Sequence, residues 1–329
     1  MTESGVDGWV GDSAALHAAR TSVRRYAPVR APVLIRGQTG TGKELAAKAV
    51  HHHSGRTGRF VAVNCGGVTT SLVHSHLFGH VRGAFTGAST ERRGAFAQAQ
   101  DGTLFLDELG ELPLSCQALL LRALESGEVQ PVGSERSFHA TARIVCATHQ
   151  DLEAMVAEGR FRADLFHRLS VLTVTMPSLA ERPDDVGDLL AHFAQLLRTD
   201  VGHAIVFSRD AVAAARSAPW PGNVRQLRNA VLRAALVRGT RPIDAAALLR
   251  ETDAPDPSAR IELAPGPFVS MRRALVEAVV AREGSIRKAS TVLNVPRSTL
   301  GNWLRNVPRR PPPESDPATR RDRGRAARG

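Results

Sequence analysis

The glycine-rich segment at residues 37–43, Gly-Gln-Thr-Gly-Thr-Gly-Lys, limits the fold of this chain more than any other stretch of its sequence. The apolar run Val33-Leu34-Ile35 precedes it, and a helical pattern begins near Glu44. A strand, a glycine-rich turn and a helix in this order form a phosphate-binding loop, where backbone N–H groups and the helix N-terminus attract phosphates. The lysine is expected to reach the β- and γ-phosphates of ATP. The candidate ATP-binding residues here are Gly37, Gln38, Thr39, Gly40, Thr41, Gly42, Lys43 and Glu44.

A second motif, Leu104-Phe105-Leu106-Asp107-Glu108, is an apolar run that ends in two carboxylates. A buried parallel strand places its carboxyl end at the ligand crevice of an open α/β sheet. We therefore expect Asp107 to hold Mg²⁺, directly or through water, and Glu108 to polarise the attacking water as a general base. Position 44 is Glu where the generic loop motif has Ser or Thr, so Mg²⁺ must rely more on Asp107 and water.

Apolar and polar patterning predicts an α/β fold followed by helical segments. Near-continuous apolar runs at residues 32–36, 59–63, 103–106 and 142–146 are typical of buried parallel strands covered by helices. From about residue 179 such runs stop and amphipathic helical patterns follow. The predicted organisation is an α/β subdomain at 1–178, a helical subdomain at 179–250, a proline-rich linker at 251–267, a compact helical domain at 268–308 and a disordered basic tail at 309–329.

The segment from residue 286 to residue 305 has the spacing of a helix–turn–helix. Ile286, Ala289, Val292 and Leu293 are expected to share one helix face, and Asn294 with Val295-Pro296 then predicts a turn. In the second helix Leu300, Trp303 and Leu304 are expected to face inward, and Gly301 costs about 1 kcal/mol of helix stability. Outward residues suited to phosphate and base-edge contacts are Arg297, Ser298, Asn302 and Arg305. By pattern alone, a purely structural three-helix unit fits about equally well.

Charge and cysteine content narrow the class of protein. The formal net charge of +11 favours an anionic partner such as nucleic acid, but only weakly, because a biased genome also produces an arginine-rich composition. The three cysteines lack metal-ligand spacing and are expected to be buried or neutral thiols in a reducing cytosol. With no apolar run of transmembrane length and no signal peptide, the sequence predicts a soluble, cytoplasmic protein without a membrane partner.

Residues 83–88, Gly-Ala-Phe-Thr-Gly-Ala, combine small residues with one aromatic and one hydroxyl side chain. Glycine at this density disfavours both helix and strand, which predicts an exposed loop tip that presents Phe85 to a partner. Taken alone, six such residues would be an ordinary surface turn. The flanking nucleotide motifs favour the partner-binding interpretation.

Residues 37–44, 83–88 and 102–108 resemble the AAA+ domain of bacterial enhancer-binding proteins, the NtrC-type activators of sigma-54 RNA polymerase. The resemblance runs from about residue 9 to 249 and resumes from 268 to about 307. It implies a P-loop sheet with helices on both faces, a helical lid, a Fis-type helix–turn–helix domain that binds double-stranded DNA at upstream enhancer sites, and a homo-oligomeric ring, usually a hexamer. ATP hydrolysis would drive the loop against the sigma-54 RNA polymerase holoenzyme through Gly83, Ala84, Phe85, Thr86, Gly87 and Ala88.

The resemblance also assigns roles to single residues. Asn64 matches the asparagine that restrains the catalytic glutamate, and Thr148 matches the sensor I region. Arg225 matches sensor II, which reaches from the lid to the nucleotide. Arg162 and Arg168 match the proposed arginine fingers, guanidinium groups that a neighbouring subunit supplies to stabilise the transferring phosphoryl group.

Four positions depart from the pattern of this family. His76, Val81 and Ala97 stand where relatives usually have Glu, and His149 stands where they usually have Asn. Losing carboxylates around the moving loop predicts looser coupling to the nucleotide, and His149 predicts slower or retuned hydrolysis. Because the catalytic residues are intact, we expect a working ATPase.

The AAA+ pattern starts within about the first ten residues, so no receiver or ligand-sensing domain is expected in front of it, and we hypothesise control in trans by a separate regulatory protein. Two other functions compete with activation: a DNA-bound repressor that uses ATP to set its oligomeric state, and an AAA+ remodeller of another client. The substitution Thr86→Ala separates them, because only an activator should lose transcription while keeping DNA binding and ATP hydrolysis.

Overall fold

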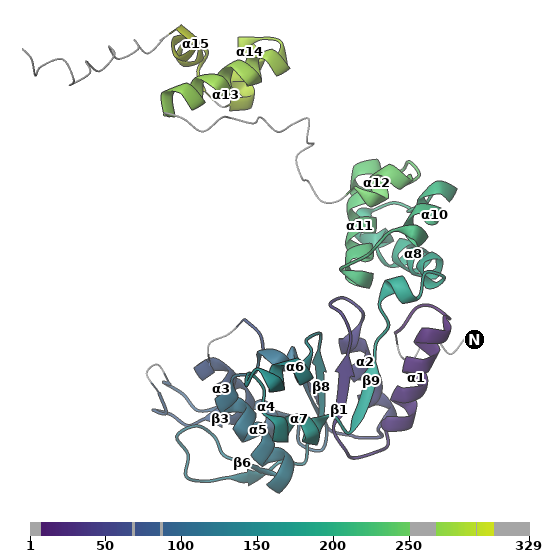
Figure 1. Ribbon diagram of the computed structural model, residues 1–329, viewed down its shortest axis with the longest axis vertical. Coiled ribbons are helices and arrows are strands. Elements are labelled where there is room, and N and C mark those ends of the chain that lie inside the picture. The colour runs from purple at the N-terminus through teal and green to yellow at the C-terminus, as the bar shows by residue number, and fades with distance from the viewer. Residues whose placement is uncertain (1–7, 68–69, 86–87, 251–267, 294, 306–329) are drawn as a thin grey trace, which may run out of the picture. The chain divides into compact units, whose positions relative to one another are not determined.

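The computed structural model describes residues 8–67, 70–85, 88–250, 268–293 and 295–305, and the chain divides into two compact units after Arg250 (Figure 1). Unit 1 contains a parallel sheet and a group of helices that follows it in sequence. Unit 2 is helical. No helix of the described residues has the length and apolar character needed to cross a membrane.

A five-stranded parallel sheet in the order β2-β5-β8-β1-β9 forms the centre of unit 1. Its strands are β1 (Val33–Arg36), β2 (Phe60–Asn64), β5 (Thr103–Asp107), β8 (Arg143–Thr148) and β9 (Leu172–Thr175). The predicted α/β class is confirmed. The sequence analysis missed β9 because this short edge strand alternates Leu and Val with Thr, and of its side chains only that of Val174 is fully buried.

The interpretation of β2 as a strand buried on both faces was wrong. It lies at the other edge of the sheet, where its residues alternate between half-buried and exposed. The central strands have the buried side chains that near-continuous apolar runs predict, because β5 and β8 are each paired on both sides and covered on both faces.

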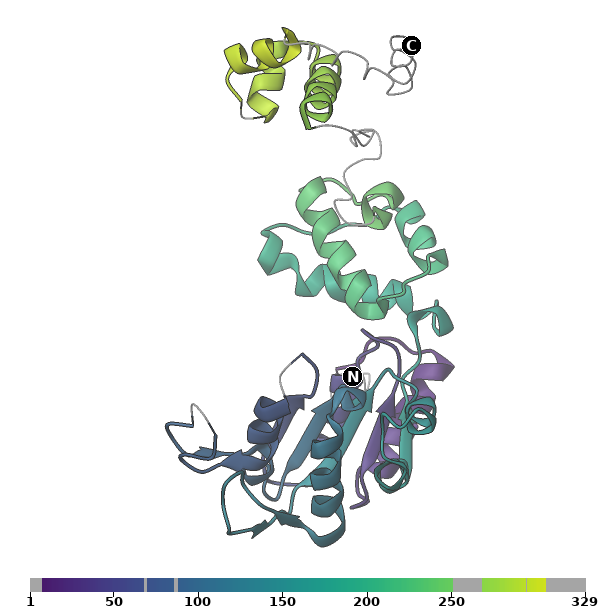
Figure 2. The ribbon, with the colours of Figure 1, turned by 60° about the vertical axis from the view of Figure 1, so that its left-hand side comes forward.

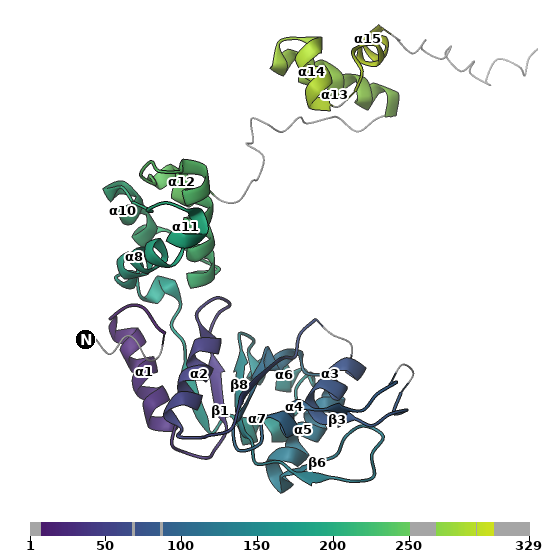
Figure 3. The same ribbon diagram turned by 180° about the vertical axis from the view of Figure 1, so that it is seen from behind.

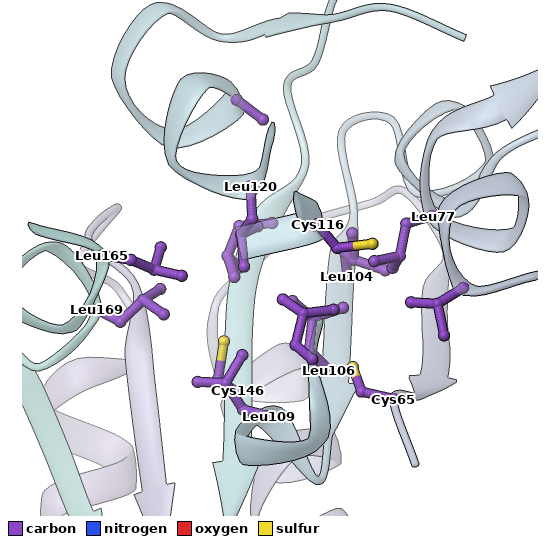
Figure 4. Packing of buried hydrophobic residues seen from close by; sticks show 14 of the residues in the cluster. Cys65, Leu77, Leu104, Leu106, Leu109, Cys116, Leu120, Cys146, Leu165 and Leu169 are labelled. Atoms are coloured by element: carbon purple, nitrogen blue, oxygen red, sulfur yellow. The ribbon is translucent and has the colours of Figure 1, made fainter. Parts of the chain in front are cut away.

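Alternate side chains of the central strands enter two separate cores, so helices cover both faces of the sheet. The core on one face includes Leu34, Leu104, Leu106, Ile144 and Cys146 (Figure 4). Packed against it are α3 (Thr70–Phe78), α4 (Ala95–Gln98), α5 (Leu114–Ser126), α6 (Leu152–Ala157) and α7 (Ala163–Leu169). The core on the other face includes Val33, Ile35, Phe105, Val145 and Ala147, with α1 (Ala14–Tyr26) and α2 (Lys43–His53) against it.

Two short antiparallel hairpins extend from the α/β layer. The first, β3 (Gly79–His80) with β4 (Arg92–Arg93), carries residues 83–88 and lies at the end of the layer opposite α1 (Figure 3). The second pairs β6 (Glu128–Val129) with β7 (Phe138–His139).

The helices that follow β9 in sequence pack together at one end of the sheet, and we call this group the lid (Figure 2). A 3₁₀ turn at Leu179–Glu181 leads into it, stabilised by a capping box in which the Glu181 carboxylate accepts hydrogen bonds from the Ser178 backbone and hydroxyl. The lid helices are α8 (Asp185–Leu196), α9 (Arg198–Val201), α10 (Arg209–Ser217), α11 (Asn223–Arg238) and α12 (Ala245–Leu249). Their apolar faces bury a third core around Trp220, Leu227 and Val231.

Unit 2 contains α13 (Phe268–Glu283), α14 (Ile286–Leu293) and α15 (Arg297–Arg305) around a small core of Val276, Val279, Ala289 and Leu300. The expected shared face of α14 is only partly right. Ala289 and Leu293 enter the core, whereas the side chains of Ile286 and Val292 are 37% and 60% exposed. Asn294, the linker at 251–267 and the tail at 309–329 lie outside the described residues.

Candidate functional site

Residues 37–42 form a glycine-rich loop between β1 and α2. Gly40 and Gly42 adopt positive φ values of 80° and 100°, a region that side-chain-bearing residues rarely enter. The second of them is the N-cap of α2, which therefore begins at Lys43 with its N-terminus toward the loop. The sequence thus folds locally into the arrangement that attracts anions at a helix N-terminus.

Lys43 lies inside this loop and is 7% exposed. Its Nζ donates hydrogen bonds to the carbonyl oxygens of Gly37 (3.0 Å) and Gln38 (3.3 Å). Burial lowers the pKa of the Lys43 ammonium, although the nearby Glu108 and Asp107 carboxylates act in the opposite direction. A buried ammonium that rests on loop carbonyls is placed to bind an entering phosphate.

Asp107 is the last residue of β5 and Glu108 follows it directly, so both acidic residues lie at the carboxyl end of this strand. Asp107 Oδ1 accepts a hydrogen bond from the backbone N–H of Glu108 (3.0 Å), and burial raises the pKa of the Asp107 carboxyl. Glu108 adopts left-handed backbone angles (φ 52°, ψ 50°), which turn the chain sharply out of the strand. As a result both carboxylates border the same cavity as Lys43.

Two further predicted site residues, Thr148 and Asn64, lie at neighbouring strand ends. Thr148 ends β8 and is buried, with its Oγ1 accepting a hydrogen bond from Gln150 N. Asn64 ends β2 opposite Asp107, but its Oδ1 accepts from Gly66 N (2.7 Å), and among the described residues no hydrogen bond joins it to Glu108. The Glu108 carboxylate instead lies 2.6 Å from Nδ1 of His149.

The sequence analysis assigned no role to Asn223, which joins the lid to the glycine-rich loop. Its side chain is buried, and Nδ2 donates to Gln38 Oε1 (3.1 Å) and the Thr39 carbonyl (3.0 Å). Its Oδ1 accepts from Leu179 N (2.7 Å). The signal was its position after Pro-Gly, since Asn tolerates the left-handed φ of 51° observed here.

The loop and the lid approach closely at two glycines. A Cβ atom added to Gly40 would lie 2.2 Å from the carbonyl oxygen of Gly222. Arg225, in the first turn of α11, borders the cavity with Lys43 and reduces the pKa of that lysine by charge repulsion. Arg225 therefore lies beside the glycine-rich loop, and its backbone N–H donates to the Gly40 carbonyl (3.4 Å).

Between loop, strand ends and lid is a cavity of about 530 Å³, which we call the loop–lid cavity. Its polar side is formed by Lys43, Asp107, Glu108 and Arg225. Its apolar side includes Trp9, Leu45 and Phe193, which motif spacing did not reveal because they come from three distant segments. A cavity lined by apolar side chains together with a phosphate-attracting loop suits an organic anion with an aromatic part.

The residues fit a nucleotide with Mg²⁺. Within the described ranges, no three His, Cys, Asp or Glu side chains gather as a metal cage. Mg²⁺ does not need one, because in nucleotide sites it keeps several waters and takes one or two carboxylates beside the phosphates. Asp107 is the carboxylate placed to do this, whereas Glu44 is exposed on α2 and forms an ion pair with Lys48 (2.8 Å).

The two candidate arginine fingers do not border the loop–lid cavity. Arg162 precedes α7, is exposed and pairs with Asp164 (2.7 Å). Arg168 is also exposed and donates to the Leu124 carbonyl (3.2 Å). Their exposure leaves both guanidinium groups accessible from outside the chain.

The loop at 83–88 is described except for Thr86 and Gly87. Gly83 N donates to the Ala88 carbonyl (2.9 Å), which closes the loop. The expectation of an exposed Phe85 was wrong: this side chain is half-buried, and its ring lies 5.0 Å from the ring of His80. An aromatic ring on a small hairpin reduces its contact with water by packing on the nearest flat side chain.

In unit 2, Arg297, Ser298 and Asn302 are exposed on α15, and the side chain of Arg305 lies outside the described set. Leu300 is fully buried, and Trp303 and Leu304 are half-buried against it. The expected inward and outward sides of this helix therefore agree with the structure.

Comparison with known proteins decides the family. Residues 9–175, just over half of the chain, match a family model described as the Sigma-54 interaction domain. The chain belongs to the sigma-54 activator family. Residues 180–263 match a second model, the AAA+ ATPase lid domain.

Relatives of the chain within this family include transcription regulators. The anaerobic nitric oxide reductase transcription regulator NorR of Vibrio vulnificus is 39% identical over 89% of this chain and 58% of its own length. The Nif-specific regulatory protein of Herbaspirillum seropedicae is 45% identical over 71% of this chain and 44% of its own. The chain spans about half the length of the curated relatives it matches.

A solved structure is similar to this chain over most of the chain's length. The crystal structure of NtrX from Brucella abortus in complex with ADP has a TM-score of 0.70 and 34% identity, covering 90% of this chain and 68% of NtrX. A crystal structure of the same protein with ATP matches equally well.

Proposed function

We propose that this protein is an ATP-dependent transcriptional activator that converts closed complexes of sigma-54 RNA polymerase to open ones. The observation that carries the proposal is the meeting of Lys43, Asp107, Glu108 and Arg225 at one loop–lid cavity in a chain of the sigma-54 activator family. These residues come from three separate segments of the chain, so chance proximity is a poor explanation. The ADP and ATP complexes of NtrX support a nucleotide as the ligand.

Bound ATP with Mg²⁺ supplies the scissile phosphoryl bond and neutralises its charge. The backbone N–H groups of the glycine-rich loop and the Lys43 ammonium bind the phosphates, and Asp107 holds the ion directly or through water. Glu108 accepts the proton of the attacking water. Thr148 and Asn64 support this edge of the sheet, and Arg225 joins the site from the lid.

Assembly and DNA binding complete the proposal. Exposed Arg162 and Arg168 would act on the nucleotide of a neighbouring subunit in a hexamer, which makes hydrolysis depend on the ring. Unit 2 would bind upstream enhancer DNA through the exposed side of α15, a role that the net charge of +11 supports. The 83–88 loop would contact sigma-54, and the protein would act in the cytoplasm.

Promoter opening tests the proposal directly. Purified protein, ATP and sigma-54 polymerase are expected to produce open complexes on a supercoiled promoter, detected by permanganate reactivity of unpaired thymines. Glu108→Gln should abolish opening and ATP hydrolysis. Thr86→Ala should abolish opening alone, whereas Thr90→Ala on the same hairpin should leave both intact.

The competing functions give different results in this assay. A repressor would produce no open complexes and would be insensitive to Thr86→Ala. A remodeller of another client would hydrolyse ATP without opening any sigma-54 promoter. Either result would contradict the activator proposal while leaving the nucleotide site in place.

A further inference from the structure

A histidine contacts the glutamate that borders the loop–lid cavity. Nδ1 of His149 lies 2.6 Å from Oε2 of Glu108. The two residues are 41 positions apart and follow the ends of adjacent parallel strands, β8 and β5. Their side chains are 41% and 23% exposed, so the pair lies at the cavity rim and not in the core.

The chemistry of this contact fixes the direction of the hydrogen bond. A carboxylate only accepts, so the proton belongs to His149 Nδ1 and the ring donates. One oxygen of Glu108 is then occupied by the imidazole, and the other is left to accept a proton from water. The left-handed backbone of Glu108 (φ 52°, ψ 50°) directs this carboxylate to the rim.

Asn64, the residue that the sequence resemblance links to the glutamate, is engaged elsewhere. Its Oδ1 accepts from Gly66 N at 2.7 Å. An asparagine at position 149 would place its Nδ2 the same number of bonds from the backbone as the histidine Nδ1. A side chain at position 149 therefore reaches Glu108 only when its N–H donor is the right number of bonds from the main chain. Asn and His both meet this condition.

We propose that His149 is a positioning residue that holds the Glu108 carboxylate at the cavity rim in the orientation needed to activate water. This inference rests on the proposed ATPase function and adds a residue to it. Because His149 orients the base and does not contact the nucleotide, its loss should lower kcat and leave KM and nucleotide affinity unchanged.

The first test compares three substitutions at position 149 in the full chain. His149→Ala is expected to lower kcat for ATP about 10-fold or more, since misplacing a reacting group by about 1 Å costs up to about 100-fold. His149→Asn should restore most of kcat. His149→Gln should not, because its amide nitrogen is one bond further from the backbone. His203→Ala, which replaces a half-buried histidine of the lid, is the matched control.

The second test needs no hydrolysis. In protein labelled with ¹⁵N-histidine and free of nucleotide, the His149 signal, identified by its loss in His149→Asn, should show a protonated Nδ1. In Glu108→Ala this tautomer preference should disappear, whereas Asn64→Ala should leave it unchanged. A His149 signal that does not respond to Glu108→Ala would refute the contact.

The outcomes separate this inference from the proposed function. If the unsubstituted protein hydrolyses no ATP, the proposed ATPase function is wrong. If Glu108→Gln still hydrolyses ATP, the assignment of Glu108 as the base is wrong, and the positioning role of His149 fails with it. If Glu108→Gln is inactive but His149→Ala has an unchanged or higher kcat, only the positioning role fails. The contact between His149 and Glu108 then has no effect on hydrolysis or slows it.

Discussion

Asn223 shows how much one side chain contributes to joining two parts of unit 1. Its amide makes hydrogen bonds to Gln38, Thr39 and Leu179, which belong to the glycine-rich loop and the first turn of the lid. A buried amide that satisfies both its donor and its acceptor groups is costly to remove, because its partners are left without hydrogen bonds.

Removing this amide should weaken nucleotide binding. Asn223→Gly keeps the backbone freedom that a φ of 51° requires and deletes only the side chain. Losing three hydrogen bonds of about 0.5–1.5 kcal/mol each should raise the Kd for a fluorescent ADP analogue at least 10-fold. Asn229→Gly, at an exposed position of the same helix, should leave the Kd within about 2-fold. Equal effects of the two variants would contradict the proposed role.

The three cysteines illustrate how burial controls reactivity at the residue scale. Burial raises the pKa of the Cys65 thiol to about 12 and raises those of Cys116 and Cys146 as well. All three lie in the core on one face of the sheet (Figure 4). The sequence analysis expected buried or neutral thiols, and the structure agrees.

These thiols should resist modification in the native protein. Since the thiolate is the reactive form, Ellman's reagent at pH 8 should label less than one thiol per native chain and all three after denaturation. Ala204→Cys, at an exposed position of a lid loop, should add one rapidly reacting thiol and serves as the positive control. Rapid labelling of native Cys65 would show that the core opens easily.

At the scale of elements, Arg143 attaches helix α1 to the sheet. It opens β8, is 2% exposed, and donates hydrogen bonds to the carbonyls of Tyr26 (2.8 Å) and Ala27 at the end of α1. Burial lowers its pKa to about 10, and the charge of Arg56 acts in the same direction. At neutral pH the guanidinium is therefore still charged, and its positive charge interacts favourably with the carbonyl end of the helix.

Arg143→Lys should destabilise unit 1. Lysine keeps the charge but cannot reach two carbonyls with a fixed fork. Hydrogen bonds from charged groups contribute about 1.5–3 kcal/mol, so a loss of about 2 kcal/mol in the free energy of unfolding is expected in urea denaturation followed by circular dichroism. Arg136→Lys, exposed between β6 and β7, should change it by less than about 0.5 kcal/mol.

Elements defined by contiguous residues were predictable, and those defined by tertiary neighbours were not. The glycine-rich loop, β5 and α15 follow from local patterns. Strand β9 was not predicted because an edge strand needs only one buried side chain. The exposure of Phe85 was predicted wrongly because the ring of His80 packs against it. The contact of His149 with Glu108 depends on β5 and β8 being adjacent, which no spacing along the chain reveals.

At the scale of the whole molecule, the nucleotide should act on one unit only. The loop–lid cavity lies entirely within residues of unit 1, and unit 2 has its own small core. In calorimetry, ADP at about 100 times its Kd should stabilise unit 1 by about 2.7 kcal/mol and raise its Tm by about 5–10 °C. The Tm of the unit 2 helices should not change. A common shift of both transitions would show that the units unfold together.

The contact between Gly40 and Gly222 has a mechanical consequence. Two parts of a protein move together only when the contact between them is rigid, and long side chains at the contact would weaken this coupling by changing rotamer. Here two backbones meet with no side chain between them, since even a methyl group on Gly40 would collide with the Gly222 carbonyl. A rotation of the lid is therefore transmitted directly to the main chain of the loop. This pair of glycines thus couples the position of the lid helices to the position of any ligand bound by the loop.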